Sequence, residues 1–115
     1  PQAAPHCEHV YNQYVARVRD GRRDELLAGL RERQVGCAVY YPKPLHLQTC
    51  FADLGYRAGD FPESERASAE TIALPIYPEL GAERQEAVIR AMADVLGVAT
   101  GSRGKTYHVP SKRAA

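Results

Sequence analysis

The sequence predicts a single two-layer α/β domain in which helices pack against one small sheet. Three observations carry this prediction: segments with apolar residues at every second position, segments with apolar residues three and four positions apart, and the alternation of both kinds along the chain. The predicted order is strand, helix, strand, long loop, short helix, strand or edge segment, helix. A length of 115 residues suffices for one domain and is too short for two.

The first strand and the first helix are expected over residues 9–19 and 20–34. Valines and tyrosines of residues 9–19 alternate between two faces, which is typical of a strand. Leucines of residues 20–34 recur three and four positions apart, which predicts a helix of about three turns. Asp20 is the expected N-cap, Asp24 suits the positive end of the helix dipole, and Arg23 is assigned to the polar face.

Two further apolar runs are expected to be strands. "VGCAV" (35–39) has valines at both ends, which is consistent with a buried strand. "TIALPIYP" (71–78) is interrupted by Pro75. Because proline cannot donate to a sheet ladder, this strand must end at Pro75 or lie at an edge.

Two more helices complete the predicted domain. A short helix is expected from Asp60 and Pro62 to about Thr71, since proline is tolerated in a first turn. The clearest helix is expected over residues 81–97, where Gly97 can close it in the left-handed conformation. Its apolar face comprises Val88, Ile89, Met92, Val95 and Leu96.

The domain is expected to span residues 9–97, between an N-terminal loop (1–8) and a flexible tail (98–115). A formal net charge of +1 gives no reason to expect nucleic acid or an anionic membrane as a partner. No apolar run approaches the roughly 20 residues that span a bilayer, and three scattered cysteines favour a reducing cytoplasm. The chain starts without signal-peptide features and its one methionine is internal, which fits a piece of a longer protein.

The stretch "YYPKPLH" (40–46) is the candidate binding segment. Pro42 and Pro44 fix their own backbone and restrict their neighbours to extended shapes, so the segment is ordered in advance. Tyr40, Tyr41 and His46 then offer two phenols and an imidazole from a stiff support, which suits recognition of a polar ligand. The alternative from the residues alone is that the tyrosines pack as core or lid and that His46 is an ordinary loop histidine.

Other chemistry finds little support in the sequence. Lys43 lies between two prolines on a predicted surface loop, which does not favour a Schiff-base lysine. An extended backbone would splay His6 and Cys7 of "HCEH" to opposite sides, and no second ligand pair has a zinc-like spacing, so no metal site is expected. No Gly-rich phosphate loop stands between a strand and a helix. These residues predict a domain that binds a ligand without catalytic groups of its own.

Four quoted motifs resemble a known family. "HVYNQYV", "RRDELLAGLRERQVG", "YYPKPLHLQTCF" and "FPESERASAETIALPIYPEL" resemble, in this order and spacing, the C-terminal small domain of DegT/StrS-type sugar aminotransferases. The resemblance covers residues 9–97. It implies a small, mostly antiparallel sheet packed by helices, as in fold-type I enzymes that depend on pyridoxal phosphate.

The resemblance also implies a function. Such enzymes aminate a keto sugar carried on a nucleotide, with glutamate as the usual donor, in polysaccharide or antibiotic-sugar pathways. They are cytoplasmic homodimers. The segment matching "YYPKPLH" lines the mouth of their active site, so Tyr40, Tyr41 and His46 would be substrate contacts. The Schiff-base lysine, the cofactor phosphate site and the Asp that pairs with the pyridine nitrogen belong to a preceding large domain. The resemblance therefore implies an inactive fragment, with no catalytic or cofactor-binding residue in this chain and pyridoxal phosphate bound elsewhere.

Two departures from the family pattern concern helix ends. Gln34 stands where such sequences usually have glycine, and Gly81 stands where a capping Thr or Ser is common. Two other functions stay open beside the enzyme fragment: a free-standing nucleotide-sugar-binding or regulatory module without catalysis, and a remnant without activity. Fold similarity alone does not separate these three, because function belongs to the complete site.

Overall fold

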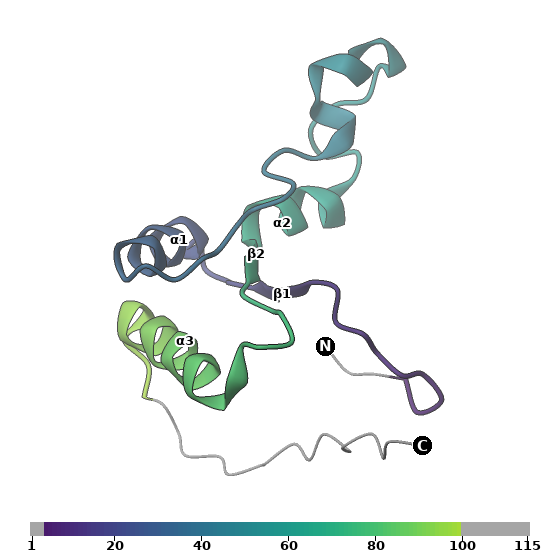
Figure 1. The fold of residues 1–115 in the computed structure, drawn as a ribbon. Coiled ribbons are helices and arrows are strands. Elements are labelled where there is room, and N and C mark those ends of the chain that lie inside the picture. Colours follow the sequence, from purple (N-terminus) through teal and green to yellow (C-terminus); the bar gives the residue numbers. More distant parts are fainter. Residues whose placement is uncertain (1–3, 100–115) are drawn as a thin grey trace.

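The computed structural model describes residues 4–99 and confirms the predicted fold class, a small antiparallel sheet packed by helices. Figure 1 shows α1 and α3 side by side next to the sheet, α2 running into β2, and an arm of two short 3-10 helices projecting from the rest. Residues 100–115, most of the predicted tail, lie outside the described residues. The elements in chain order are β1 (Tyr14–Arg17), α1 (Arg23–Glu32), η1 (Leu45–Leu47), η2 (Thr49–Leu54), α2 (Pro62–Glu70), β2 (Thr71–Leu74) and α3 (Gly81–Leu96).

The sheet is short because both of its strands are limited by local chemistry. β1 and β2 pair antiparallel, with Val15 opposite Ala73. β2 ends at Leu74, directly before Pro75, as the sequence predicts. The predicted strand over residues 9–19 begins only at Tyr14. In its first half Tyr11 adopts a left-handed backbone (φ 48°), and its N–H donates to His9 Nδ1 at 2.9 Å, so a local turn replaces sheet pairing.

The predicted strand over residues 35–39 is wrong apart from a single bridge. Ala38 pairs with Ala73 on the free edge of β2: the Ala73 N–H donates to the Ala38 carbonyl at 2.7 Å, and the Ala38 N–H donates back at 3.1 Å. Pro75 has no N–H to extend the ladder toward Gly36. The bridge nevertheless fixes the point at which the chain leaves the sheet toward residues 40–46.

Helix α1 keeps the predicted apolar stripe but not the predicted cap. Asp20 lies outside the helix with φ 61°, and the N-cap position is Arg22, which makes no side-chain cap bond. The helix ends through Gln34, whose φ is 58°. The Val35 N–H then donates to the Leu30 carbonyl at 2.9 Å, a closure that normally uses glycine at the left-handed position.

Arg23 is buried, although the sequence pattern assigns it to the polar face of α1. Its Nη1 donates to the carbonyl of Ser68 at 2.9 Å and to that of Thr71 at 3.2 Å, while its Nε pairs with Asp24 at 2.6 Å. These carbonyls lie where α2 passes directly into β2, and carbonyls at a helix end lack partners within the helix. The long cationic side chain of Arg23 reaches these two carbonyls. Helical periodicity alone could not predict this contact, so the assignment of Arg23 to the polar face is wrong.

The core lies between α1, β2 and the second half of α3. Leu26, Leu30 and Ile72 are fully buried, with Val18 and Ala91 beside them. Close packing of α1 on α3 requires Gly29, because a Cβ at this position would lie 2.6 Å from Val95 Cγ2. No helix of the described residues is long and apolar enough to cross a membrane.

The predicted helices α2 and α3 are both present. Pro62 stands at the start of α2, and Gly97 closes α3 with φ 64°, as expected. Ile89 is 52% exposed, so its assignment to the buried face of α3 is wrong. Residues 81–90 contain no buried side chain, since α1 covers only the later part of α3 (Figure 1).

Replacing Arg23 by Met should lower the free energy of unfolding by about 2 kcal/mol or more. Met keeps the aliphatic stem but leaves the carbonyls of Ser68 and Thr71 without their charged donor. Urea unfolding followed by circular dichroism measures the change. The control Arg19→Met removes an exposed arginine and should stay within about 0.5 kcal/mol of the wild type. Equal stability of both variants would contradict the role given to Arg23.

Candidate functional site

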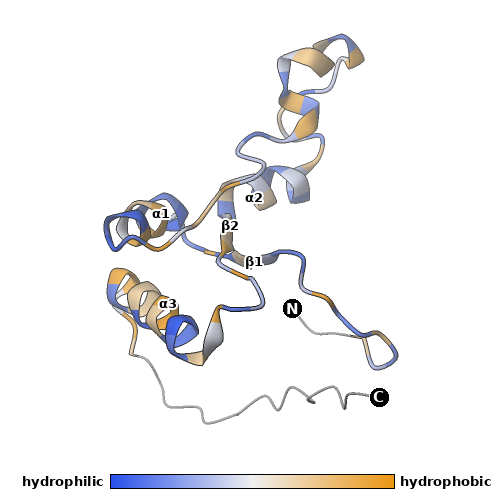
Figure 2. Cartoon of the chain, viewed as in Figure 1, coloured by the Kyte–Doolittle hydropathy of each residue, from blue (hydrophilic) through white to orange (hydrophobic). Residues whose placement is uncertain are grey.

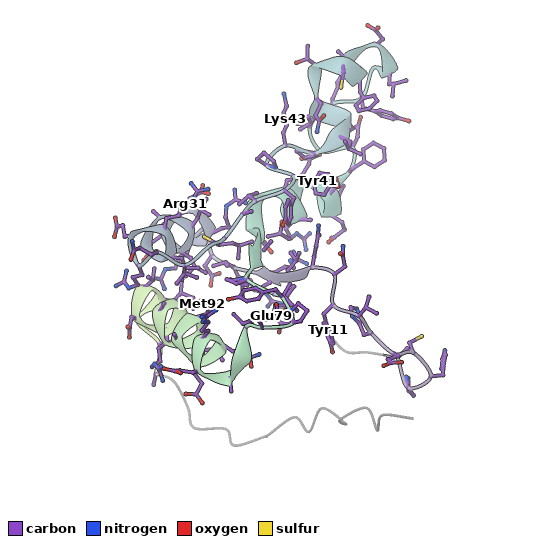
Figure 3. All side chains as sticks on the ribbon, viewed as in Figure 1. Tyr11, Arg31, Tyr41, Lys43, Glu79 and Met92 are labelled. Carbon is purple, nitrogen blue, oxygen red and sulfur yellow. The ribbon has the colours of Figure 1, made fainter. Side chains whose placement is uncertain are left out.

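The candidate binding segment runs from the sheet into the projecting arm. Figure 3 labels Tyr41 and Lys43 on this stretch. Pro44 is buried and precedes η1, while Tyr40 and Tyr41 are 56% and 66% exposed. A buried Pro44 after two open phenols argues against tyrosines packed in a core and is consistent with the predicted support for ligand contacts.

Tyr40 and Tyr41 line one cavity of about 370 Å³. Polar groups from several segments face it, among them Gln13 before β1, Lys43, and Ser64 of α2. None of the described residues that line this cavity carries a carboxylate, so the Lys43 ammonium is not neutralised there. The lining combines two phenols, an amide, three hydroxyl side chains and one cation with apolar residues, which suits a ligand that carries polar or anionic groups beside an apolar part.

His46 does not join the two tyrosines. It lines a separate cavity of about 330 Å³ with apolar and aromatic residues of the arm, including Phe51 and Phe61. Its side chain is 7% exposed, and its Nε2 lies 3.0 Å from Glu65 Oε1. Its ring centroid lies 4.9 Å from that of Phe61. A carboxylate only accepts hydrogen bonds, so the proton sits on His46 Nε2.

Glu65 holds two segments with the same oxygen. Besides the bond from His46, Glu65 Oε1 accepts the Gly59 N–H at 2.8 Å. The pKa of Glu65 is lowered, and the main cause is the hydrogen bond from the Gly59 N–H. Desolvation opposes this shift, and the hydrogen bond with His46 reinforces it. A lowered folded-state pKa adds stability above the unfolded-state pKa, and this contribution is lost as the pH falls through the folded-state pKa. Both bonds are therefore present at neutral pH.

The arm exposes many large apolar side chains. Phe61 makes an edge-on contact with Tyr56, with centroids 5.0 Å apart, and Figure 2 shows hydrophobic residues along much of the arm. Large exposed apolar patches are typical of surfaces that bind a partner or a ligand. The exposed large hydrophobic residues from the binding segment to the start of α2 are Tyr40, Tyr41, Leu45, Phe51, Leu54, Tyr56 and Phe61.

The described residues do not fit pyridoxal phosphate. Lys43 is the single lysine within residues 4–99, and it is exposed on a loop rather than enclosed beside a phosphate cradle. Burial chiefly raises the pKa of the Cys37 thiol, with Arg31 opposing, so Cys37 is a poor thiolate nucleophile. No group of three His, Cys, Asp or Glu side chains in this part of the chain could hold a metal ion.

Sequence reasoning missed Glu65 and the lining role of Lys43. Glu65 and His46 are 19 positions apart, and no local pattern pairs a loop histidine with a helix carboxylate at that distance. The signal for Lys43 was present, because it lies between the two prolines that display the tyrosines.

Comparisons with known proteins show the family of this chain. A family model of the DegT/DnrJ/EryC1/StrS aminotransferase family matches residues 1–93. The chain is 48% identical over 86 residues to a "Pleiotropic regulatory protein" of Geobacillus stearothermophilus, covering 75% of this chain and 23% of that protein. It is 41% identical over 90 residues to the dTDP-3-amino-3,4,6-trideoxy-alpha-D-glucose transaminase of Micromonospora megalomicea subsp. nigra, covering 77% and 24%.

A solved structure gives the same result. The crystal structure of S. venezuelae DesV in complex with a ketimine intermediate superimposes with a TM-score of 0.72 at 31% identity, covering 82% of this chain and 25% of that one. The chain thus spans about a quarter of the length of these relatives. The resemblance noted in the sequence is confirmed, and the chain belongs to the DegT/DnrJ/EryC1/StrS aminotransferase family.

Proposed function

We propose that this chain is the C-terminal, substrate-lining domain of a nucleotide-sugar aminotransferase that depends on pyridoxal phosphate. The enzyme transfers an amino group from glutamate to a keto sugar carried on a nucleotide. The observation that carries this proposal is the cavity of about 370 Å³, where Tyr40 and Tyr41 stand open beside an unneutralised lysine. The chain's similarity to a transaminase of a dTDP-linked amino sugar supplies the substrate class.

The three predicted site residues take different roles in this proposal. Tyr40 and Tyr41 donate hydrogen bonds to sugar hydroxyls or to the diphosphate, and Lys43 supplies a positive charge for the diphosphate. His46, which the sequence predicts as a substrate contact, instead holds the segment in place in this proposal, because its ring is almost fully covered and bonded to Glu65.

The proposal places the cofactor outside residues 4–99. These residues offer no enclosed lysine, and the relatives are about four times as long as the part matched here. The chain alone is therefore expected to be inactive. The exposed aromatic arm would be covered by the cofactor-bearing domain or by a second subunit of a cytoplasmic homodimer.

A regulatory module that binds a nucleotide sugar without turnover is the second candidate. It is favoured by two relatives' names, a "Pleiotropic regulatory protein" and the "Erythromycin biosynthesis sensory transduction protein EryC1" of Saccharopolyspora erythraea. An assay for glutamate-dependent amination, with the protein as the gene encodes it, separates the two candidates. Saturable binding of a dTDP-sugar without amination would favour the module.

Tyr41→Phe should lower kcat/KM for the sugar nucleotide by about tenfold, because it removes one hydrogen bond to a polar or charged group. Steady-state kinetics on the gene-encoded protein measures the loss, and the cofactor absorbance should stay unchanged. The matched control is Tyr11→Phe, since Tyr11 lies in the N-terminal segment and lines neither of the two cavities described above. Equal kinetics of Tyr41→Phe and the wild type would remove Tyr41 from the site.

The 115-residue chain should not bind pyridoxal phosphate covalently. Titration with the cofactor, followed by absorbance spectroscopy and mass spectrometry after borohydride reduction, should give no band and no added mass from a lysine-linked cofactor. A stoichiometric adduct that disappears in Lys43→Ala would overturn the placement of the cofactor outside this chain.

A further inference from the structure

The two exposed tyrosines lie between two fixed points of the chain. On the N-terminal side, Ala38 is held by both of its backbone hydrogen bonds to Ala73 of β2. On the C-terminal side, His46 is held by Glu65 at 3.0 Å. The backbone that carries Tyr40 and Tyr41 lies between these two attached positions, Ala38 and His46.

The backbone between the tyrosines and His46 has little conformational freedom. Pro42 and Pro44 each have a fixed φ, and Pro44 is buried. The Leu47 N–H donates to the Pro44 carbonyl at 3.1 Å, which closes η1 onto the prolines. The Gln48 side chain donates to the Lys43 carbonyl at 3.3 Å. Because this segment is stiff, a displacement of His46 would also displace Tyr40 and Tyr41.

Both attachments belong to one continuous piece of structure. Glu65 lies in the first turn of α2, Ala73 lies in β2, and α2 passes into β2 without an intervening loop. The same carboxylate oxygen of Glu65 also takes the Gly59 N–H at 2.8 Å, so it holds the turn before α2 as well. One carboxylate of α2 thus bonds to both the arm and the turn that precedes the helix.

We infer that Glu65 is a positioning residue: its carboxylate holds His46 and the Gly59 turn, and thereby sets the place of Tyr40 and Tyr41 at the cavity. The inference rests on the proposed function, since it names what orients the substrate-lining segment. Glu65 itself touches no reacting group in this arrangement and acts through His46.

Three variants of the gene-encoded protein test the inference. Glu65→Ala removes both hydrogen bonds and should raise KM for the sugar nucleotide about tenfold, with kcat and the KM for glutamate nearly unchanged. Glu65→Gln keeps an acceptor oxygen and should restore most of the affinity. The matched control is Glu63→Ala in the same first turn, whose side chain is 74% exposed and pairs with Arg66 outside the segment. Its KM should equal that of the wild type.

Nuclear magnetic resonance on the same variants reads the positions directly and does not depend on turnover. In Glu65→Ala the imidazole of His46 should lose its fixed proton on Nε2, and the ring resonances of Tyr40 and Tyr41 should shift, while those of α1 and α3 stay in place. Movement of the α1 and α3 resonances would mean general unfolding and would overturn a role confined to positioning.

The outcomes separate the two proposals. An active wild type whose Glu65→Ala variant keeps its KM and its tyrosine resonances overturns the positioning role and leaves the aminotransferase proposal standing. An inactive wild type overturns the aminotransferase proposal. In that case the shift or constancy of the Tyr40 and Tyr41 resonances still decides whether Glu65 orients them.

Discussion

The rest of the structure depends on the junction where α2 becomes β2 with no loop between them. Carbonyls at the end of α2 need donors from outside the helix, and the buried guanidinium of Arg23 supplies them for Ser68 and Thr71. The Thr71 hydroxyl donates to the backbone carbonyl of Ala67, and the Val18 N–H donates to the backbone carbonyl of Glu70. Donors from α1, from the end of β1 and from the junction itself thus converge on the carbonyls of one turn of chain. Hydrogen bonding of these carbonyls therefore brings α1, β1 and the junction together.

The junction also explains how so small a sheet can carry a defined site. Two strands of four residues each would be marginal alone. Burial of Ile72 against Leu26 and Leu30, together with the bonds from Arg23, fixes β2 in the domain. β2 can then hold Ala38, from which the binding segment departs. Stability of the core and geometry of the site therefore share the same short strand.

Periodicity in the sequence predicts the elements well and the functional contacts poorly. The leucines of α1, the proline at the start of α2 and Gly97 after α3 specify real helices, because propensity and patterning are local. Arg23 is misassigned because tertiary hydrogen bonds, and not helix position, decide where it lies. Asp20 is misassigned because its left-handed backbone (φ 61°) places it outside the helix. The run at 35–39 is apolar enough for a strand, yet it finds only one bridge on β2.

The candidate site shows the same division. Two adjacent tyrosines followed by two prolines within three positions predict a stiff, exposed, polar segment, and Tyr40 and Tyr41 are indeed exposed. The imidazole of His46 looks equally available in the sequence. Its partner Glu65 lies on another element, and only the folded chain shows that the ring is already engaged.

The loop-free junction also bears on how this domain can vary in length. A residue inserted between Glu70 and Thr71 would exchange the two faces of β2 and shift its register against β1, because strand side chains alternate with a period of two. The turn around Gly55 and Gly59 is exposed and has left-handed glycines that accommodate other lengths. Insertions and deletions among natural homologues should therefore be absent at the α2–β2 boundary, and the turn at residues 55–58 should accept them where the Gly59 N–H still reaches Glu65.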